Sequence, residues 1–168
     1  MQAAEDGSDH LMEVSMKVRE FMTKDVQSCT ETSDLATVAK IMWDADCGIV
    51  PVVDDNGRVI GVITDRDICI AAATRSLDPA SISVSEAMSR NVATCLEDAD
   101  SRSALEALRE RRVRRLPVLN RQNRLVGILS MNDLITRTDF RQAAGVPADE
   151  ILNTLRAISA HTASAVSA

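Results

Sequence analysis

The chain has 168 residues, of which 45% are hydrophobic, 26% are charged and only 2% are aromatic. Its formal net charge of −6 argues against broad binding to nucleic acid, because phosphate neutralisation needs a surface rich in Lys and Arg. No apolar run approaches the roughly 20 residues of a membrane span, so we expect no membrane partner and, by default, a cytoplasmic protein with reduced thiols.

The first part of the chain predicts a short helical start. Residues 1–14 are polar and acidic, without the basic and apolar regions of a signal peptide, and we expect a flexible lead-in there. A helical turn is expected at 17–23. A longer helix begins after Asp34, its expected N-cap, because the apolar residues that follow recur at spacings of three and four. We expect Gly48 to end that helix.

Strands follow in the order that a small mixed fold requires. The apolar runs 49–53 and 59–63 predict two strands, and the turn residues at 55–57 between them predict a hairpin. A second helix is expected over 68–73, so that one unit is turn, helix, strand, hairpin, strand and helix.

This unit occurs twice in the chain. Residues 18–73 align with residues 84–139 without a gap, at a constant offset of 66. Because a unit of roughly 55 residues is marginal alone, we expect the two copies to share one cooperative core. The predicted divisions are a flexible N-terminus (1–14), repeat 1 (16–75), a linker (76–83), repeat 2 (84–139) and a C-terminal helical extension (140–168).

Cysteine and histidine usage gives no sign of a metal site. These residues are Cys29, Cys47, Cys69, Cys95, His10 and His161. No pair forms a CxxC motif and both histidines lie outside the repeats, so we expect no metal ion. Cys29 and Cys95 occupy equivalent positions, which is compatible with a disulfide or redox role or with repeat symmetry alone. Cys47 and Cys69 are expected to be buried.

The junctions from strand to helix carry the pattern with most chemical content. Thr64 and Asp67 stand three residues apart where a strand passes into a helix, and Ser130 and Asp133 repeat the arrangement. A hydroxyl and a carboxylate so placed can hold a ribose, because the carboxylate accepts from two hydroxyl groups. Nearby helix N-terminal amides favour an anion. The same spacing is also a helix-capping signature, so capping alone remains an open alternative.

Taken together, these features resemble the tandem CBS (cystathionine β-synthase) domain pair, or Bateman module. The resemblance rests on the order of elements, the Pro-Val pair of each repeat and the duplicated Gly-apolar-apolar-Thr/Ser-x-x-Asp motif, and covers about residues 16–139. Small stand-alone two-CBS proteins of the hypoxic-response kind are the most similar members. The resemblance implies an α+β fold in which two β-α-β-β-α repeats pack about a pseudo-twofold axis, with an appended C-terminal helix.

The resemblance also implies ligands and an assembly. Members usually form homodimers through helices, and clefts between their repeats bind AMP, ADP or ATP, or sometimes NAD or S-adenosylmethionine, with no obligatory cofactor. Thr64 and Asp67 would hold the ribose in one cleft, and Ser130 and Asp133 in the other. Residues of the short strands and of the strands beside them would contact the adenine, and these are Cys29, Thr30, Val50, Cys95 and Leu116.

The phosphate groups would need cations, and here the repeats differ. Arg114 or Arg115 lies where the family commonly places a phosphate contact, and Arg66 in the first motif is a second candidate. At the stretch that matches the arginines, repeat 1 has Gly48. Asp65 adds a negative charge beside the first motif. We therefore expect two unequal clefts.

The resemblance thus implies a regulatory sensor of adenine nucleotides, whose ligand changes the arrangement of repeats or protomers for an unidentified partner protein to read. The alternative is a ligand-free structural dimer in which both motifs merely cap helices. No Ser-His-Asp, Cys-His or metal constellation is present in the sequence, so we expect no enzyme. Trp43 is interpreted either as a dimer anchor or as a half-buried side chain.

Overall fold

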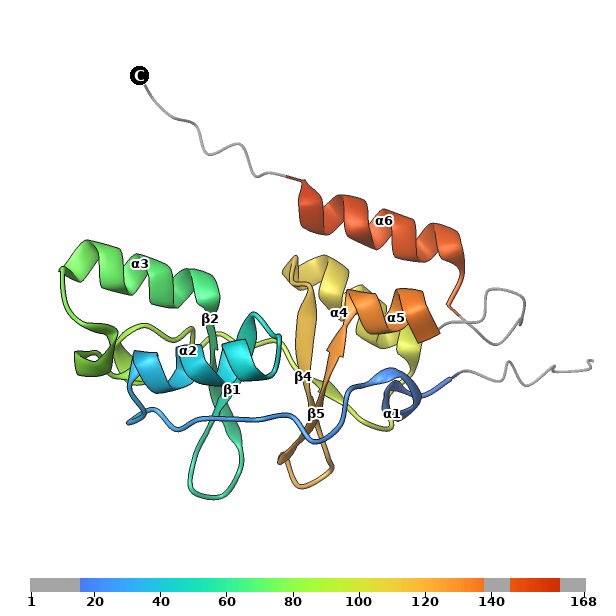
Figure 1. The fold of residues 1–168 in the computed structure, drawn as a ribbon. Coiled ribbons are helices and arrows are strands. Elements are labelled where there is room, and N and C mark those ends of the chain that lie inside the picture. Colours follow the sequence, from blue (N-terminus) through green and yellow to red (C-terminus); the bar gives the residue numbers. More distant parts are fainter. Residues whose placement is uncertain (1–15, 138–145, 161–168) are drawn as a thin grey trace, which may run out of the picture.

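The computed structural model describes residues 16–137 and 146–160. The predicted lead-in at 1–14 and the two histidines, His10 and His161, lie outside these residues. Two copies of one mixed α+β unit lie side by side, and an additional helix follows the second copy (Figure 1).

The first repeat follows the predicted order of elements. Its elements are α1 (Val18–Phe21), α2 (Leu35–Asp44), β1 (Ile49–Val53), β2 (Val59–Thr64) and α3 (Asp65–Arg75). The predicted N-cap of α2 is confirmed, because Asp34 accepts a hydrogen bond of 2.8 Å from the backbone N–H of Thr37. The predicted hairpin is confirmed too, and Gly57 has the positive φ of 76° that its turn needs.

The second repeat has equivalent elements and is followed by one additional helix. Two short 3₁₀ turns, η1 (Pro79–Ser81) and η2 (Val84–Glu86), lead into β3 (Cys95–Leu96), α4 (Ser101–Arg111), β4 (Arg115–Leu119), β5 (Leu125–Ser130), α5 (Met131–Arg137) and α6 (Ala148–Ser159). The expected end of the first long helix was wrong. Helix α2 ends at Asp44, and Asp46 rather than Gly48 takes the left-handed conformation, with φ of 47°. Aspartate tolerates this region better than most residues, and the equivalent Arg112 adopts it as well.

Each repeat contributes one small sheet, and the two sheets have equivalent antiparallel strand pairs. Strands β1 and β2 form an antiparallel pair, and β4 and β5 form the equivalent pair, which β3 extends in parallel. In repeat 1, a single parallel bridge from Cys29 to Val52 takes the place of β3. An antiparallel bridge joins Arg58 to Arg124, two residues that are exactly one repeat apart, so the pseudo-twofold axis passes between them.

Each repeat receives its entry segment from the other side of the axis. Val18 and Phe21 of α1 are fully buried in the hydrophobic core of repeat 2, and Val84 of η2 is buried in the core of repeat 1. The motif glycines make this crossing possible. A Cβ at Gly127 would lie 2.6 Å from the carbonyl oxygen of Thr23, and one at Gly61 would lie 2.8 Å from the Met88 sulfur. The two repeats are therefore interlocked.

Helix α6 covers only repeat 2. It lies along α4 and α5 (Figure 1), with Ile151 and Thr154 buried and Leu155 and Ile158 packed against the same core. The corresponding helices of repeat 1, α2 and α3, have no such cover within the described chain. None of the described helices has the length and apolar character that crossing a membrane would require.

Candidate functional site

The predicted hydroxyl–carboxylate pairs form capping boxes at the starts of α3 and α5. Thr64 donates its hydroxyl to Asp67 Oδ2 at 2.7 Å and its backbone N–H to the same oxygen at 3.0 Å, while the Asp67 N–H donates to the Thr64 hydroxyl at 3.2 Å. Ser130 and Asp133 repeat all three bonds. Both motifs therefore cap helices. A ligand could also bind to them only where open space remains beside the motif.

A cleft of about 510 Å³, which we call cleft 1, lies beside the first motif. Thr64, Arg66 and Asp67 line it from repeat 1. The facing wall comes from the crossing segment 89–93 and from the residues at and just before the start of β4. The latter are Arg112, Val113, Arg114, Arg115 and Pro117. The structure therefore brings the first motif together with the arginines that precede the equivalent strand of the other repeat.

Cleft 1 carries an excess of positive charge. Four guanidinium groups line it, from Arg66, Arg112, Arg114 and Arg115, against the carboxylates of Asp65 and Asp67. Among the described residues none of these four arginines has an ion-pair partner within 4 Å. Guanidinium groups bind phosphate oxygens through paired hydrogen bonds, so this wall has donors for a phosphate group.

The second cleft is smaller and less basic. Cleft 2 has a volume of about 400 Å³ and lies beside Ser130 of the second motif. Its other walls include the crossing segment 23–27 and the turn after α2, which contains Asp46. Arg115 lines both clefts. Lys24 and Asp25 add one charge of each sign. The expectation of two unequal clefts agrees with this charge distribution.

The residues predicted to contact the base do not line either cleft, and their role stays a prediction. Cys29, Val50 and Leu116 are buried, with exposures of 6%, 1% and 0%, and Cys95 is partly buried. Thr30 is exposed and bonds to Ser33 and Thr32 in its own turn. None of these five predicted base contacts is among the residues that line either cleft.

The crossing segments 23–27 and 89–93 line cleft 2 and cleft 1, respectively. Sequence reasoning missed them because it kept each entry segment with its own repeat. The signal available was the pair Gly61 and Gly127, whose missing side chains leave space for a crossing backbone.

The cysteines are all free thiols. Cys29 and Cys95 form no disulfide, and burial raises the pKa of Cys29 to about 11 and that of Cys95 to about 12. The expectation that Cys47 and Cys69 are buried was wrong, because Cys47 is partly exposed and Cys69 is exposed. Within the described residues no group of three or more His, Cys, Asp or Glu side chains is placed to hold a metal ion.

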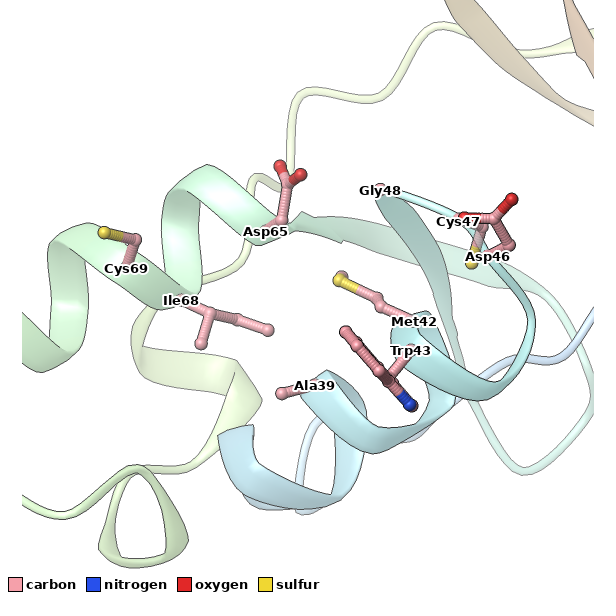
Figure 2. A pocket seen from close by; sticks show the side chains of 9 residues that line it. All are labelled: Ala39, Met42, Trp43, Asp46, Cys47, Gly48, Asp65, Ile68 and Cys69. Carbon is pink, nitrogen blue, oxygen red and sulfur yellow. The ribbon is translucent and has the colours of Figure 1, made fainter.

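A third hollow, of about 500 Å³, lies between α2 and α3 on the helical face of repeat 1. Figure 2 shows Ile68 of α3 pointing toward Ala39, Met42 and Trp43 of α2 across this groove. Trp43 is 86% exposed, so the interpretation of a half-buried side chain was wrong. We call this hollow the α2–α3 groove.

Comparison with known proteins gives two matches to one family in this chain. The family model of the CBS domain matches residues 18–73 and 84–139. YlbB of Bacillus subtilis is 31% identical over 136 residues, which are 80% of this chain and 90% of that protein. The inosine-5′-monophosphate dehydrogenase of Methanocaldococcus jannaschii is 29% identical over 80% of this chain, which spans only 26% of that enzyme.

Solved structures agree on the fold. Hypoxic Response Protein I, solved with two coordinated zinc ions, has a TM-score of 0.65 and 31% identity, covering 71% of this chain and 97% of that one. The CBS domain pair of protein MJ0100, in complex with 5′-methylthioadenosine and S-adenosyl-L-methionine, has a TM-score of 0.65 and 26% identity, covering 72% and 94%.

Proposed function

The chain belongs to the CBS domain family as a tandem pair, and on that premise we propose that it is a regulatory module that binds an adenine nucleotide in cleft 1. One observation carries this proposal above the others. Cleft 1 places the hydroxyl and carboxylate of Thr64 and Asp67 across from the arginines of the other repeat. A nucleotide carries the matching groups, a ribose diol at one end and phosphates at the other.

Each side chain has a defined role in this proposal. Asp67 accepts from the ribose hydroxyls while Thr64 holds its carboxylate in place through the capping bonds. Arg114 and Arg115, with Arg66 from the first motif, contact the phosphates. Arg112 lines the same wall and joins them.

Adenine is the base that we propose. The MJ0100 pair was solved with two ligands that both contain an adenosyl group, which supports an adenosine-type ligand here. The apolar side chains of Ile49, Val62 and Pro117 line cleft 1 and would flank the base, and the backbone of 89–93 would supply its hydrogen bonds. AMP, ADP and ATP fit this description through their phosphates better than uncharged nucleosides do.

Binding across two repeats supplies a physical basis for signalling. A nucleotide in cleft 1 would bridge groups from repeat 1 and repeat 2, so its affinity depends on their relative arrangement. Ile158 of α6 also lines cleft 1, and α6 would therefore sense occupation of the cleft directly. A regulated partner protein would then read a shift of the repeats or of α6.

We further propose that two copies associate through the α2–α3 groove. Its apolar side chains and the exposed Trp43 form a patch on repeat 1, while α6 covers the equivalent face of repeat 2. A dimer would therefore use the helices of repeat 1.

The test of nucleotide binding is a thermal unfolding series with AMP, ADP and ATP. A ligand at 100 times its Kd adds about 2.7 kcal/mol to the free energy of unfolding and raises Tm accordingly. We expect Asp67→Ala to remove this ligand-dependent shift. Asp34→Ala is the matched control, since it removes a helix cap outside both clefts and should keep the shift.

The ligand-free alternative makes a different forecast for the same series. If the first motif only caps α3, Asp67→Ala lowers stability by about 1 kcal/mol, as Asp34→Ala does, and no nucleotide shifts Tm in any variant. That outcome would replace the sensor with a structural dimer.

A further inference from the structure

We infer that each chain holds a single nucleotide, in cleft 1, because the contacts of Asp133 with Thr23 and Arg137 close the equivalent ribose position in cleft 2. The inference rests on the proposed function, since it concerns which of the two related clefts the nucleotide uses. Under this inference, Arg137 helps to keep a nucleotide out of cleft 2, a role that the alignment of the two repeats does not predict.

In repeat 1 the carboxylate is open on one side. Asp67 accepts both capping bonds from Thr64 on Oδ2. Its Oδ1 has no hydrogen-bond partner among the described residues, and Asp67 is one of the side chains that line cleft 1. A ribose hydroxyl can approach this oxygen without breaking the cap.

In repeat 2 both oxygens of the carboxylate are engaged. Asp133 Oδ2 accepts the capping bonds, and Oδ1 accepts from the Thr23 hydroxyl at 3.2 Å and lies 3.5 Å from Arg137 Nη2. The Asp133 side chain is only 13% exposed, and it is not among the residues that line cleft 2. A ribose would have to displace both partners to reach it.

Arg137 also fixes the segment that lies over Asp133. Its Nη1 donates to the carbonyl oxygens of Phe21 and Met22, at 2.8 and 2.9 Å. Displacing Arg137 would therefore leave two partly buried carbonyl groups without this donor, which is costly. The position of Arg137 beside Asp133 is therefore stabilised by its bonds to these two carbonyl groups as well as by the carboxylate.

The two repeats share the backbone arrangement and differ only in side chains at this point. Thr23 and Ile128 exchange two backbone bonds of 2.9 Å, and the equivalent Ser89 and Val62 exchange bonds of 2.9 and 3.0 Å. The position equivalent to Arg137, however, is Ala71. Repeat 1 therefore has no guanidinium group that could reach Asp67 from that position.

Charge favours the same cleft. Cleft 1 has four arginines against two carboxylates, whereas the charged groups lining cleft 2 are Lys24 and Arg115 against Asp25 and Asp46. A ligand with two or three phosphates gains more from the first set. The accessible carboxylate for the ribose and the larger number of arginines for the phosphates therefore both favour binding in cleft 1.

Isothermal titration calorimetry of the full chain with ATP tests this inference. The wild-type protein should bind one ATP per chain. Asp67→Asn should weaken binding about tenfold or more, because it removes a charged acceptor, and Asp133→Asn should leave one site of similar affinity. Asp34→Asn controls for the loss of a helix cap and should also leave one site.

Arg137→Ala, which copies the alanine of repeat 1 into repeat 2, should add a second, weaker binding event. Its Tm shows whether the variant is folded. A folded Arg137→Ala protein that still binds one ATP would overturn the part assigned to Arg137.

The remaining outcomes distinguish a failure of the single-cleft inference from a failure of the proposed nucleotide-binding function. Two ATP per wild-type chain, or a site lost in Asp133→Asn and kept in Asp67→Asn, would overturn the single-cleft inference while the proposed nucleotide sensor stands. Absence of any heat of binding with ATP, AMP or ADP, together with an unchanged Tm, would overturn the proposed function itself.

Discussion

Asp67 caps α3 and, in the proposed function, would also bind the ribose. One oxygen of its carboxylate takes the capping bonds, and the other has no hydrogen-bond partner among the described residues, while Asp67 lines cleft 1. A ligand bond to the second oxygen would leave the helix start intact, so a binding group of this kind can be rigid before the ligand arrives. Such preorganisation lowers the entropy cost of binding.

At the residue scale, the sequence predicted the capping geometry of Thr64 and Asp67, because a hydroxyl and a carboxylate three residues apart act locally. It did not predict that Arg137 engages Asp133. This contact depends on the crossing segment at Thr23, which comes from more than 100 positions earlier in the chain.

The cysteines are expected to differ in their rates of alkylation. With native protein at about pH 8, we expect iodoacetamide to modify the exposed Cys69 first, while Cys29 and Cys95 stay unmodified. The thiolate is the reactive form, and the raised pKa values of Cys29 and Cys95 keep both thiols protonated at this pH. Peptide mass spectrometry after timed quenching would measure this, with urea-unfolded protein as the control. Equal labelling rates at Cys29 and Cys69 would contradict the buried placement.

At the scale of elements, the two repeats differ in how their paired helices are covered. Residues of α6 occupy the face of α4 and α5, and the α2–α3 groove is open within the described chain (Figures 1 and 2). The apolar face of the appended helix was predictable from its spacing. Which repeat it covers was not, since helix periodicity does not encode a distant docking surface.

The exposed Trp43 is expected to be a central contact of the proposed dimer. Trp43→Ala should weaken self-association about tenfold or more, because a central aromatic anchor often contributes 2 kcal/mol or more to an interface. Sedimentation equilibrium of wild type and variant would measure the dimer constant. Leu96→Ala is the control, since Leu96 is an exposed apolar residue on β3, outside the groove. A wild-type protein that stays monomeric at high concentration would contradict the proposed dimer.

At the scale of the whole molecule, the duplication predicted most of the architecture. Repeating 18–73 at a fixed offset implied a pseudo-twofold pair, and the bridge between Arg58 and Arg124 agrees with it. The exchange of entry segments was not predicted, because a short turn such as α1 carries no mark of the core it joins. That exchange is also why the sequence did not indicate that 23–27 and 89–93 line the clefts.

Interlocking makes each cleft a property of both repeats. Cleft 1 takes its carboxylates from repeat 1 and most of its arginines from repeat 2, so in the proposed function neither repeat alone would hold a nucleotide. Under that proposal, this arrangement would allow a small ligand to bias the relation between the two halves.

The most direct measurement is a crystal structure of the protein grown with saturating AMP. The account predicts AMP in cleft 1, with ribose hydroxyls at hydrogen-bond distance from Asp67 and the phosphate against Arg114 or Arg115. AMP bound elsewhere, or an empty cleft 1 in which Asp67 contacts only Thr64, would contradict it.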